Sequence, residues 1–175
     1  MASRYFLGNL LVLAVLAAAC GDDETGPSEE RFASVLSGAG EVPAVATSAS
    51  GSASLKLRGS TMDVTVSVSN LGGAFAVHIH GPATTGQEAD PVVGLPIADG
   101  VTSGTLASVT GATATSLRGL TVMKGTVSFD SALVLIRKGL AYINVHTEAN
   151  PDGEIRGHIG KSATSNPDPP GGGGY

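Results

Sequence analysis

Four histidines are the residues of this 175-residue chain whose type and spacing could bind a metal ion. His78 and His80 lie in the segment Phe75–His80, where apolar and polar side chains alternate. This alternation predicts a β-strand, and residues two apart on a strand project from the same face. Adjacent imidazoles can chelate a metal, and neutral imidazole suits copper and zinc. His78 and His80 are therefore our first candidate ligands.

A second group of polar residues lies near the C-terminal end of the chain. Residues 141–146 and 154–159 also alternate, and the turn-forming residues between them predict a β-hairpin. A symmetric register would pair His146 with Glu154, Asn144 with Arg156, and Tyr142 with His158. These side chains would then share one polar face of the hairpin.

If the strand with His78 and His80 lies beside this hairpin, His146 becomes a third ligand. The hypothesis is then a copper or zinc site made by three imidazoles. The alternative is that these histidines hydrogen-bond to loop backbone or face water. Glu154 and Arg156 would then form a surface ion pair that contributes little stability.

Other functional classes lack their sequence signals. The chain has no Gly-x-Ser-x-Gly nucleophile motif, no phosphate-binding Gly-Lys-Ser/Thr loop and no His-Glu-x-x-His. We therefore assign no catalytic residue and expect no enzyme, although a metal-dependent redox activity stays open. The formal net charge is −5, and no Lys/Arg cluster could neutralise a row of phosphates. We expect no nucleic-acid partner.

Alternation recurs through the middle of the chain and defines the expected fold. Residues 54–58 and 63–69 read as strands, with Gly59-Ser60 as a tight turn between them. Asp130–Gly139 instead reads as a short helix, with Asp130 as N-cap and Gly139 just past its end. We predict an all-β fold, an antiparallel β-sandwich or Greek-key barrel with one short helix near residues 130–139.

The first 20 residues read as an export signal. A short apolar run ends in Ala17-Ala18-Ala19 before Cys20, which is the only cysteine. The pattern resembles a lipobox, although Leu usually stands where Ala17 does, and an ordinary secretory signal is the alternative. We predict a lipoprotein signal peptide over residues 1–19 and lipidation of Cys20. The chain would then be held at a membrane by this lipid anchor, in the cell envelope outside the cytoplasm.

The remaining boundaries follow from composition. Residues 20–30 are acidic and poor in apolar side chains, so we expect a flexible tether. Residues 31–160 should form the ordered β domain. Residues 161–175 are rich in Ser, Pro and Gly and should be a disordered tail. With a single cysteine, the domain has no disulfide of its own.

Four motifs, taken in order, resemble the chordin (CHRD) domain family. They are Phe32–Pro43 (FASVLSGAGEVP), His78–Ala83 (HIHGPA), Gly139–Thr147 (GLAYINVHT) and Gly153–Ile159 (GEIRGHI). The resemblance implies an extracellular β domain without an established catalytic activity. His158 stands where this family has Gln as often as His, so we leave it out of the ligand set.

Together these observations favour an exported, non-enzymatic binding or envelope-associated module. Its partner would be an envelope or extracellular protein. The alternative is a metal-binding protein that uses His78, His80 and His146.

Overall fold

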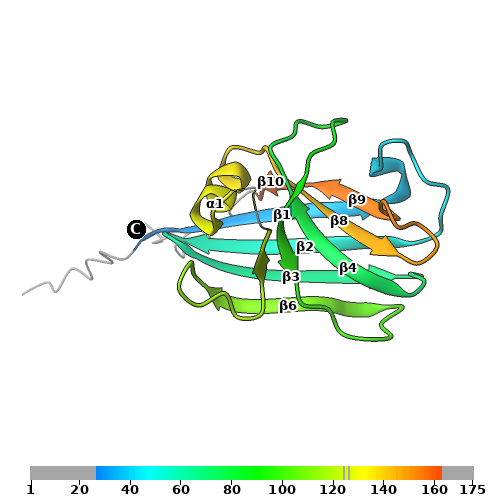
Figure 1. The fold of residues 1–175 in the computed structure, drawn as a ribbon, viewed down its shortest axis with the longest axis horizontal. Coiled ribbons are helices and arrows are strands. Elements are labelled where there is room, and N and C mark those ends of the chain that lie inside the picture. Colours follow the sequence, from blue (N-terminus) through cyan, green and yellow to red (C-terminus); the bar gives the residue numbers. More distant parts are fainter. Residues whose placement is uncertain (1–26, 124, 126, 163–175) are drawn as a thin grey trace, which may run out of the picture.

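A computed structural model describes residues 27–123, 125 and 127–162 (Figure 1). The predicted signal peptide, Cys20, most of the predicted tether and the chain beyond residue 162 lie outside these residues. The first strand begins at Glu29, slightly before the expected start of the domain at Arg31. Within the described ranges, no helix is both long enough and apolar enough to cross a membrane.

Ten strands, one 3-10 helix and one α-helix make up the described fold. The strands are β1 (Glu29–Ser37), β2 (Ser50–Arg58), β3 (Thr61–Ser69), β4 (Ala74–His80), β5 (Pro91–Leu95), β6 (Gly104–Ala112), β7 (Thr121–Val122), β8 (Tyr142–Thr147), β9 (Ile155–His158) and β10 (Gly160–Lys161). The helices are η1 (Gly38–Gly40) and α1 (Phe129–Arg137).

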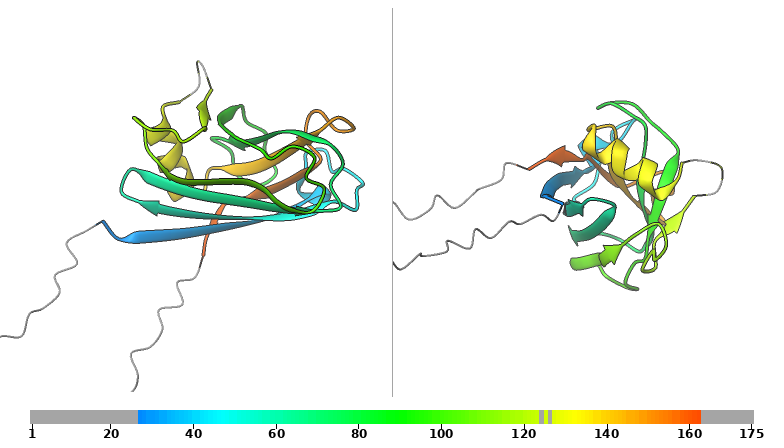
Figure 2. Two further views of the ribbon diagram at one scale, coloured as in Figure 1. Left: turned by 90° about the horizontal axis from the view of Figure 1, so that it is seen from below. Right: turned by 90° about the vertical axis from the view of Figure 1, so that its left-hand side faces the viewer.

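The strands form one antiparallel sheet in the order β6-β3-β2-β1-β9-β8-β4-β5-β7, and β10 pairs with β1. This sheet curls, so that β1, β2, β3 and β6 face the other strands across a common core (Figures 1 and 2). The predicted all-β antiparallel fold with one short helix is confirmed. Its two layers belong to one continuous sheet.

The β2–β3 hairpin follows the alternation of its sequence closely. Arg58 pairs with Thr61, so Gly59 and Ser60 form the two-residue turn that the sequence predicted. Gly59 has a φ of 57°, a left-handed conformation that glycine adopts without a steric penalty. In β3 every second residue is buried, which is the pattern of a sheet with one face on a core.

The β8 strand departs from this pattern, because all six of its residues are buried. Ile143 and Val145 face the apolar core. Tyr142, Asn144 and His146 have the opposite parity and project to the outer face of the sheet. The outer face of the sheet at β8 is therefore covered as well. The residues that cover it help to position the candidate site.

The helix occurs where the sequence predicted it but begins differently. Its N-cap is Ser128, whose hydroxyl accepts a hydrogen bond from the backbone N–H of Ser131, so the prediction of Asp130 as N-cap was wrong. Asp130 lies in the first turn, where a negative charge favours the helix dipole. Gly139 follows the C-terminal end with a φ of 65°, as predicted.

Candidate metal centre

The three candidate ligands converge on the outer face of neighbouring strands. β4 pairs with β8, so that Ala76 lies opposite His146 and His78 lies opposite Asn144. His78, His80 and His146 each offer one ring nitrogen, and these nitrogens lie within 4.8 Å of one another. The sheet thus joins two sequence segments that are far apart in the chain.

Two of the imidazoles are oriented by backbone carbonyls. His80 Nδ1 lies 2.8 Å from the carbonyl oxygen of Ala89, and His146 Nδ1 lies 2.9 Å from that of Pro151. A carbonyl can only accept, so each Nδ1 carries the proton and each Nε2 keeps its lone pair. Metal-binding histidines in proteins commonly donate their second ring N–H in this way.

The ring of His78 contacts the ring of His146 directly. His78 Nδ1 lies 3.1 Å from His146 Nε2, close to the roughly 3.3 Å that separates two nitrogens around a tetrahedral zinc ion. The Nε2 atom of His80 is buried and has no hydrogen-bond partner. Because the three nitrogens span up to 4.8 Å, closing on one ion requires ring movements of about 1 Å.

The imidazoles are held in the neutral form that binds metals. His80 and His146 are each 7% exposed, and His78 is half-buried. Burial, reinforced by the neighbouring His146, lowers the pKa of His78 to about 4, and burial also lowers the pKa of His80 to about 4. Burial lowers the pKa of His146 as well. At neutral pH the lone pairs are therefore available without loss of a proton.

A stack of side chains covers His80. The Tyr142 ring stacks on His80 with the ring centroids 4.8 Å apart, and the Arg156 guanidinium lies 3.6 Å from the Tyr142 centroid. The Tyr142 hydroxyl accepts from the N–H of Ala89 and donates to its carbonyl oxygen. Arg156 donates to the carbonyl oxygen of Gln87. The loop between β4 and β5 is thereby fixed over the ring that it orients.

The predicted hairpin register is confirmed for two pairs, Tyr142 with His158 and Asn144 with Arg156. The Glu154 carboxylate accepts hydrogen bonds from Thr47 and Thr147, so these threonines, and not the histidines, are its hydrogen-bonding partners.

The other polar residues also have local roles. Arg156 is 3% exposed, so the surface ion pair with Glu154 that we considered does not form. His158 Nε2 lies 2.9 Å from the carbonyl oxygen of Gly139, away from the three converging imidazoles. The orienting carbonyls of Ala89 and Pro151 and the covering Tyr142 were missed from sequence. In the sequence, only the even spacing between Tyr142 and His146 indicated that the two side chains lie on the same face of the strand.

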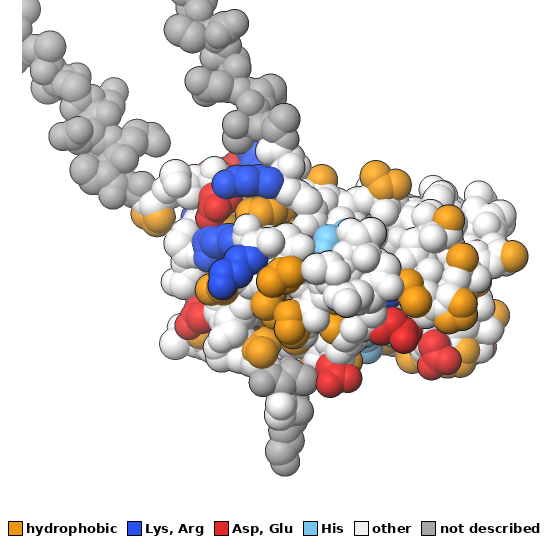
Figure 3. All heavy atoms as spheres, turned by 90° about the horizontal axis from the view of Figure 1, so that it is seen from above, with side chains coloured by type: hydrophobic (Ala, Val, Ile, Leu, Met, Phe, Trp, Pro, Cys, Tyr) orange, Lys and Arg blue, Asp and Glu red, His pale blue; other side chains and the backbone are white. Residues whose placement is uncertain are grey.

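One face of the molecule shows little histidine surface. In Figure 3 only small areas of histidine surface, drawn in pale blue, appear between other side chains. Phe75 is 54% exposed, and its ring centroid lies 6.2 Å from that of His146. Any ion held by the three imidazoles would therefore sit near the surface but largely out of water.

Comparison with known protein families gives a match. The family model described as the CHRD domain matches residues 32–159, which is most of the chain and contains all three histidines of the candidate site. No curated protein matches the sequence. No solved structure matches the fold.

Proposed function

The chain belongs to the CHRD domain family, and we propose that it is an exported, non-enzymatic module that binds one copper or zinc ion. The observation that supports this most is the convergence of three neutral imidazoles, two of which have their Nδ1–H groups fixed by backbone carbonyls. His78, His80 and His146 are the ligands.

The three imidazole nitrogens determine which class of metal ion the site can bind. Calcium and magnesium prefer six or more oxygen ligands, and a set of three imidazoles offers none. Imidazole nitrogen suits zinc and copper, and copper(II) has the highest affinity of the common divalent ions for such sites. Three protein ligands also leave one coordination position open to a further small ligand or a partner's side chain.

Calorimetric titration of the purified, chelator-treated protein with Zn²⁺ and with Cu²⁺ tests this proposal. We expect one ion per chain and loss of that binding in the variant His78→Ala/His80→Ala/His146→Ala. His158→Ala is the matched control and should bind as the unchanged protein does. Equal binding by the triple variant and the unchanged protein would exclude the site.

The second part of the proposal concerns the anchor. Cys20 follows an apolar run and small residues, and we infer that a lipid on its thiol holds the β domain outside a membrane. There the domain meets its partner, an envelope or extracellular protein. Radioactive fatty acid should label the protein, and Cys20→Ala should abolish the label and release the domain. Membrane retention of that variant would contradict the anchor without affecting the metal proposal.

A further inference from the structure

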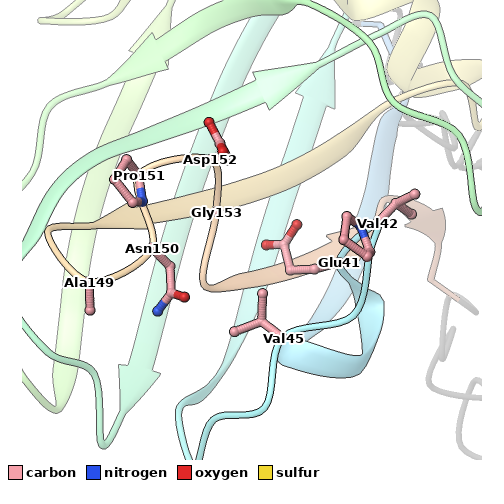
Figure 4. A pocket seen from close by; sticks show the side chains of 9 residues that line it. Glu41, Val42, Val45, Ala149, Asn150, Pro151, Asp152 and Gly153 are labelled. Carbon is pink, nitrogen blue, oxygen red and sulfur yellow. The ribbon is translucent and has the colours of Figure 1, made fainter.

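A hollow of about 290 Å³ lies beside the candidate metal centre, between two loops. One loop follows η1, and the other connects β8 to β9 (Figure 4). The lining residues are Glu41, Val42, Pro43, Val45, Ala149, Asn150, Pro151, Asp152 and Gly153. Two of these side chains carry a carboxyl group. That of Asp152 is exposed, whereas that of Glu41 is buried and therefore requires an explanation.

Among the described residues, none forms a hydrogen bond or salt bridge with the carboxyl group of Glu41. The residue is 8% exposed, and its buried Oε1 atom makes no hydrogen bond. The buried Oδ1 atom of Asn144, which is 4% exposed, also lacks a donor. A buried oxygen without a donor destabilises the folded state, and a charged one does so more strongly.

The two oxygens meet at Gly153. A Cβ atom added to Gly153 would lie 2.7 Å from Glu41 Oε1 and 2.6 Å from Asn144 Oδ1. Figure 4 shows the Glu41 carboxyl group directed toward Gly153, with the Val45 and Asn150 side chains nearby. Asn144 Nδ2 lies at the same point, 2.5 Å from the added Cβ atom, and donates to the carbonyl oxygen of Asp152. Asn144 does not line the hollow, so the acceptor without a donor on this wall is the Glu41 carboxyl group.

The charged groups around Glu41 do not supply a hydrogen-bond donor to its Oε1 atom. Burial raises the pKa of Glu41 to about 7, an effect that Glu88 adds to and Arg156 opposes. The Arg156 guanidinium donates to the Gln87 carbonyl oxygen and lies over the Tyr142 ring. A ligand that brings its own positive charge and N–H donors would stabilise the ionised carboxylate.

We propose that this hollow binds a primary ammonium group carried on a short apolar stem, with the Glu41 carboxylate as its counter-ion. The stem lies among Val42, Val45 and Ala149, and the ammonium donates to the Glu41 carboxylate. An anion would be repelled by Glu41. A hard divalent cation needs several oxygen ligands, usually more than one carboxylate, whereas the buried part of this wall offers one. The site is separate from the three imidazoles and does not depend on a bound metal.

Calorimetric titration with n-butylammonium measures this binding, with N-butylacetamide as the neutral comparison. We expect the ammonium to bind and the amide to bind at least tenfold more weakly. The peptide Gly-Lys-Gly, blocked at both ends, offers the same group on a lysine side chain. Binding of this peptide as well would identify a protein lysine as a ligand, and binding of n-butylammonium alone would identify a small amine. Equal binding of the ammonium and the amide would overturn the proposal.

Three variants locate the site. Glu41→Gln keeps the shape of the side chain and should weaken n-butylammonium binding at least tenfold. Glu148→Gln makes the same change of charge at an exposed position of the β8–β9 loop and should leave binding unchanged. Ala149→Phe fills the hollow without replacing Glu41 and should also weaken binding. Unchanged binding in both Glu41→Gln and Ala149→Phe would place the ligand elsewhere.

Discussion

The β2–β3 hairpin and the β8–β9 hairpin are built from the same alternating pattern but use it differently. In β3, buried apolar residues alternate with partly exposed polar ones, so the outer face meets water. In β8 every residue is buried, although Asn144, His146 and Thr147 are polar. The difference lies outside the strands, in the loops that cover β8.

This covering changes what polar residues can do. On β3, Thr65 and Ser67 are partly exposed and can hydrogen-bond to water. On β8 and its neighbour β4, burial removes water and holds the imidazoles neutral, and loop carbonyls replace water as the acceptors. The first hairpin is scaffold, and the second holds a chemical site because its polar face is covered.

Acid should have the largest effect, and it should act through the covered polar face of β4 and β8. Unfolded histidines take up protons below about pH 6.5, whereas the folded pKa of His78 and of His80 is about 4. The unfolded state therefore binds more protons between these values, and stability falls as the pH drops from 6.5 to 4. We expect a loss of about 3 kcal/mol for each of these histidines.

Urea unfolding of the metal-free protein at a series of pH values measures this loss. The variant His78→Gln/His80→Gln/His146→Gln should have a flatter curve in that pH window. Parallel curves for the two proteins would show that the imidazoles are not held neutral by the fold.

Truncation of the core should separate stability from metal binding. Leu57 in β2 is fully buried, so Leu57→Ala should reduce the free energy of unfolding by about 3 kcal/mol. It should leave the metal affinity of the folded protein unchanged. His80→Ala in β4 should show the reverse, a smaller loss of stability and a large loss of affinity. Urea unfolding and Zn²⁺ titration of both variants test this. A large loss of metal affinity in Leu57→Ala would show that stability and metal binding cannot be separated.

Glu41 should respond to pH with the opposite sign. Its pKa is raised from 4.5 to about 7, so the folded state binds more protons than the unfolded state between these values, and stability falls as the pH rises from 4.5 to 7 and then stays constant. Glu41→Gln should therefore be more stable than the unchanged protein at pH 8, by about 3 kcal/mol, with the gain gone at pH 4. Thermal unfolding at the two pH values measures it. A gain that is equal at both would point to packing and not to the buried charge.

The smallest effect should come from the loop that covers His80. Tyr142→Phe keeps the ring stacked on His80 but removes the hydroxyl that binds the Ala89 backbone. We expect a loss of about 1 kcal/mol in stability and a severalfold weaker metal affinity, because the carbonyl that orients His80 is less fixed. Zn²⁺ titration of this variant gives the affinity. An unchanged value would show that the loop only covers the site.

Much of this architecture follows from period-two patterns. Alternation predicted β2, β3, β4, β8 and β9, the Gly59-Ser60 turn and the shared parity of His78, His80 and His146, because parity on a strand is fixed by geometry. It could not place β4 beside β8, since strand order depends on contacts that are distant in sequence. The N-cap was missed because Ser128 and Asp130 are both good capping residues and only backbone geometry separates them.

The supporting groups of the site were hidden for a different reason. Ala89 and Pro151 contribute backbone carbonyls, which leave no mark on residue type. Glu41 lies in a motif that could be read from the sequence, but its burial beside Gly153 depends on how two loops meet.

X-ray absorption spectroscopy of the zinc-loaded protein tests the central claim most directly, because it counts the ligands and measures their distances. We predict three imidazole nitrogens at about 2.0 Å and a fourth ligand, an oxygen atom from solvent. The spectrum of His158→Ala should be identical, and His146→Ala should lose one imidazole. A zinc shell made mainly of carboxylate oxygens, or one unchanged in His146→Ala, would contradict the assignment of His78, His80 and His146 as the metal centre.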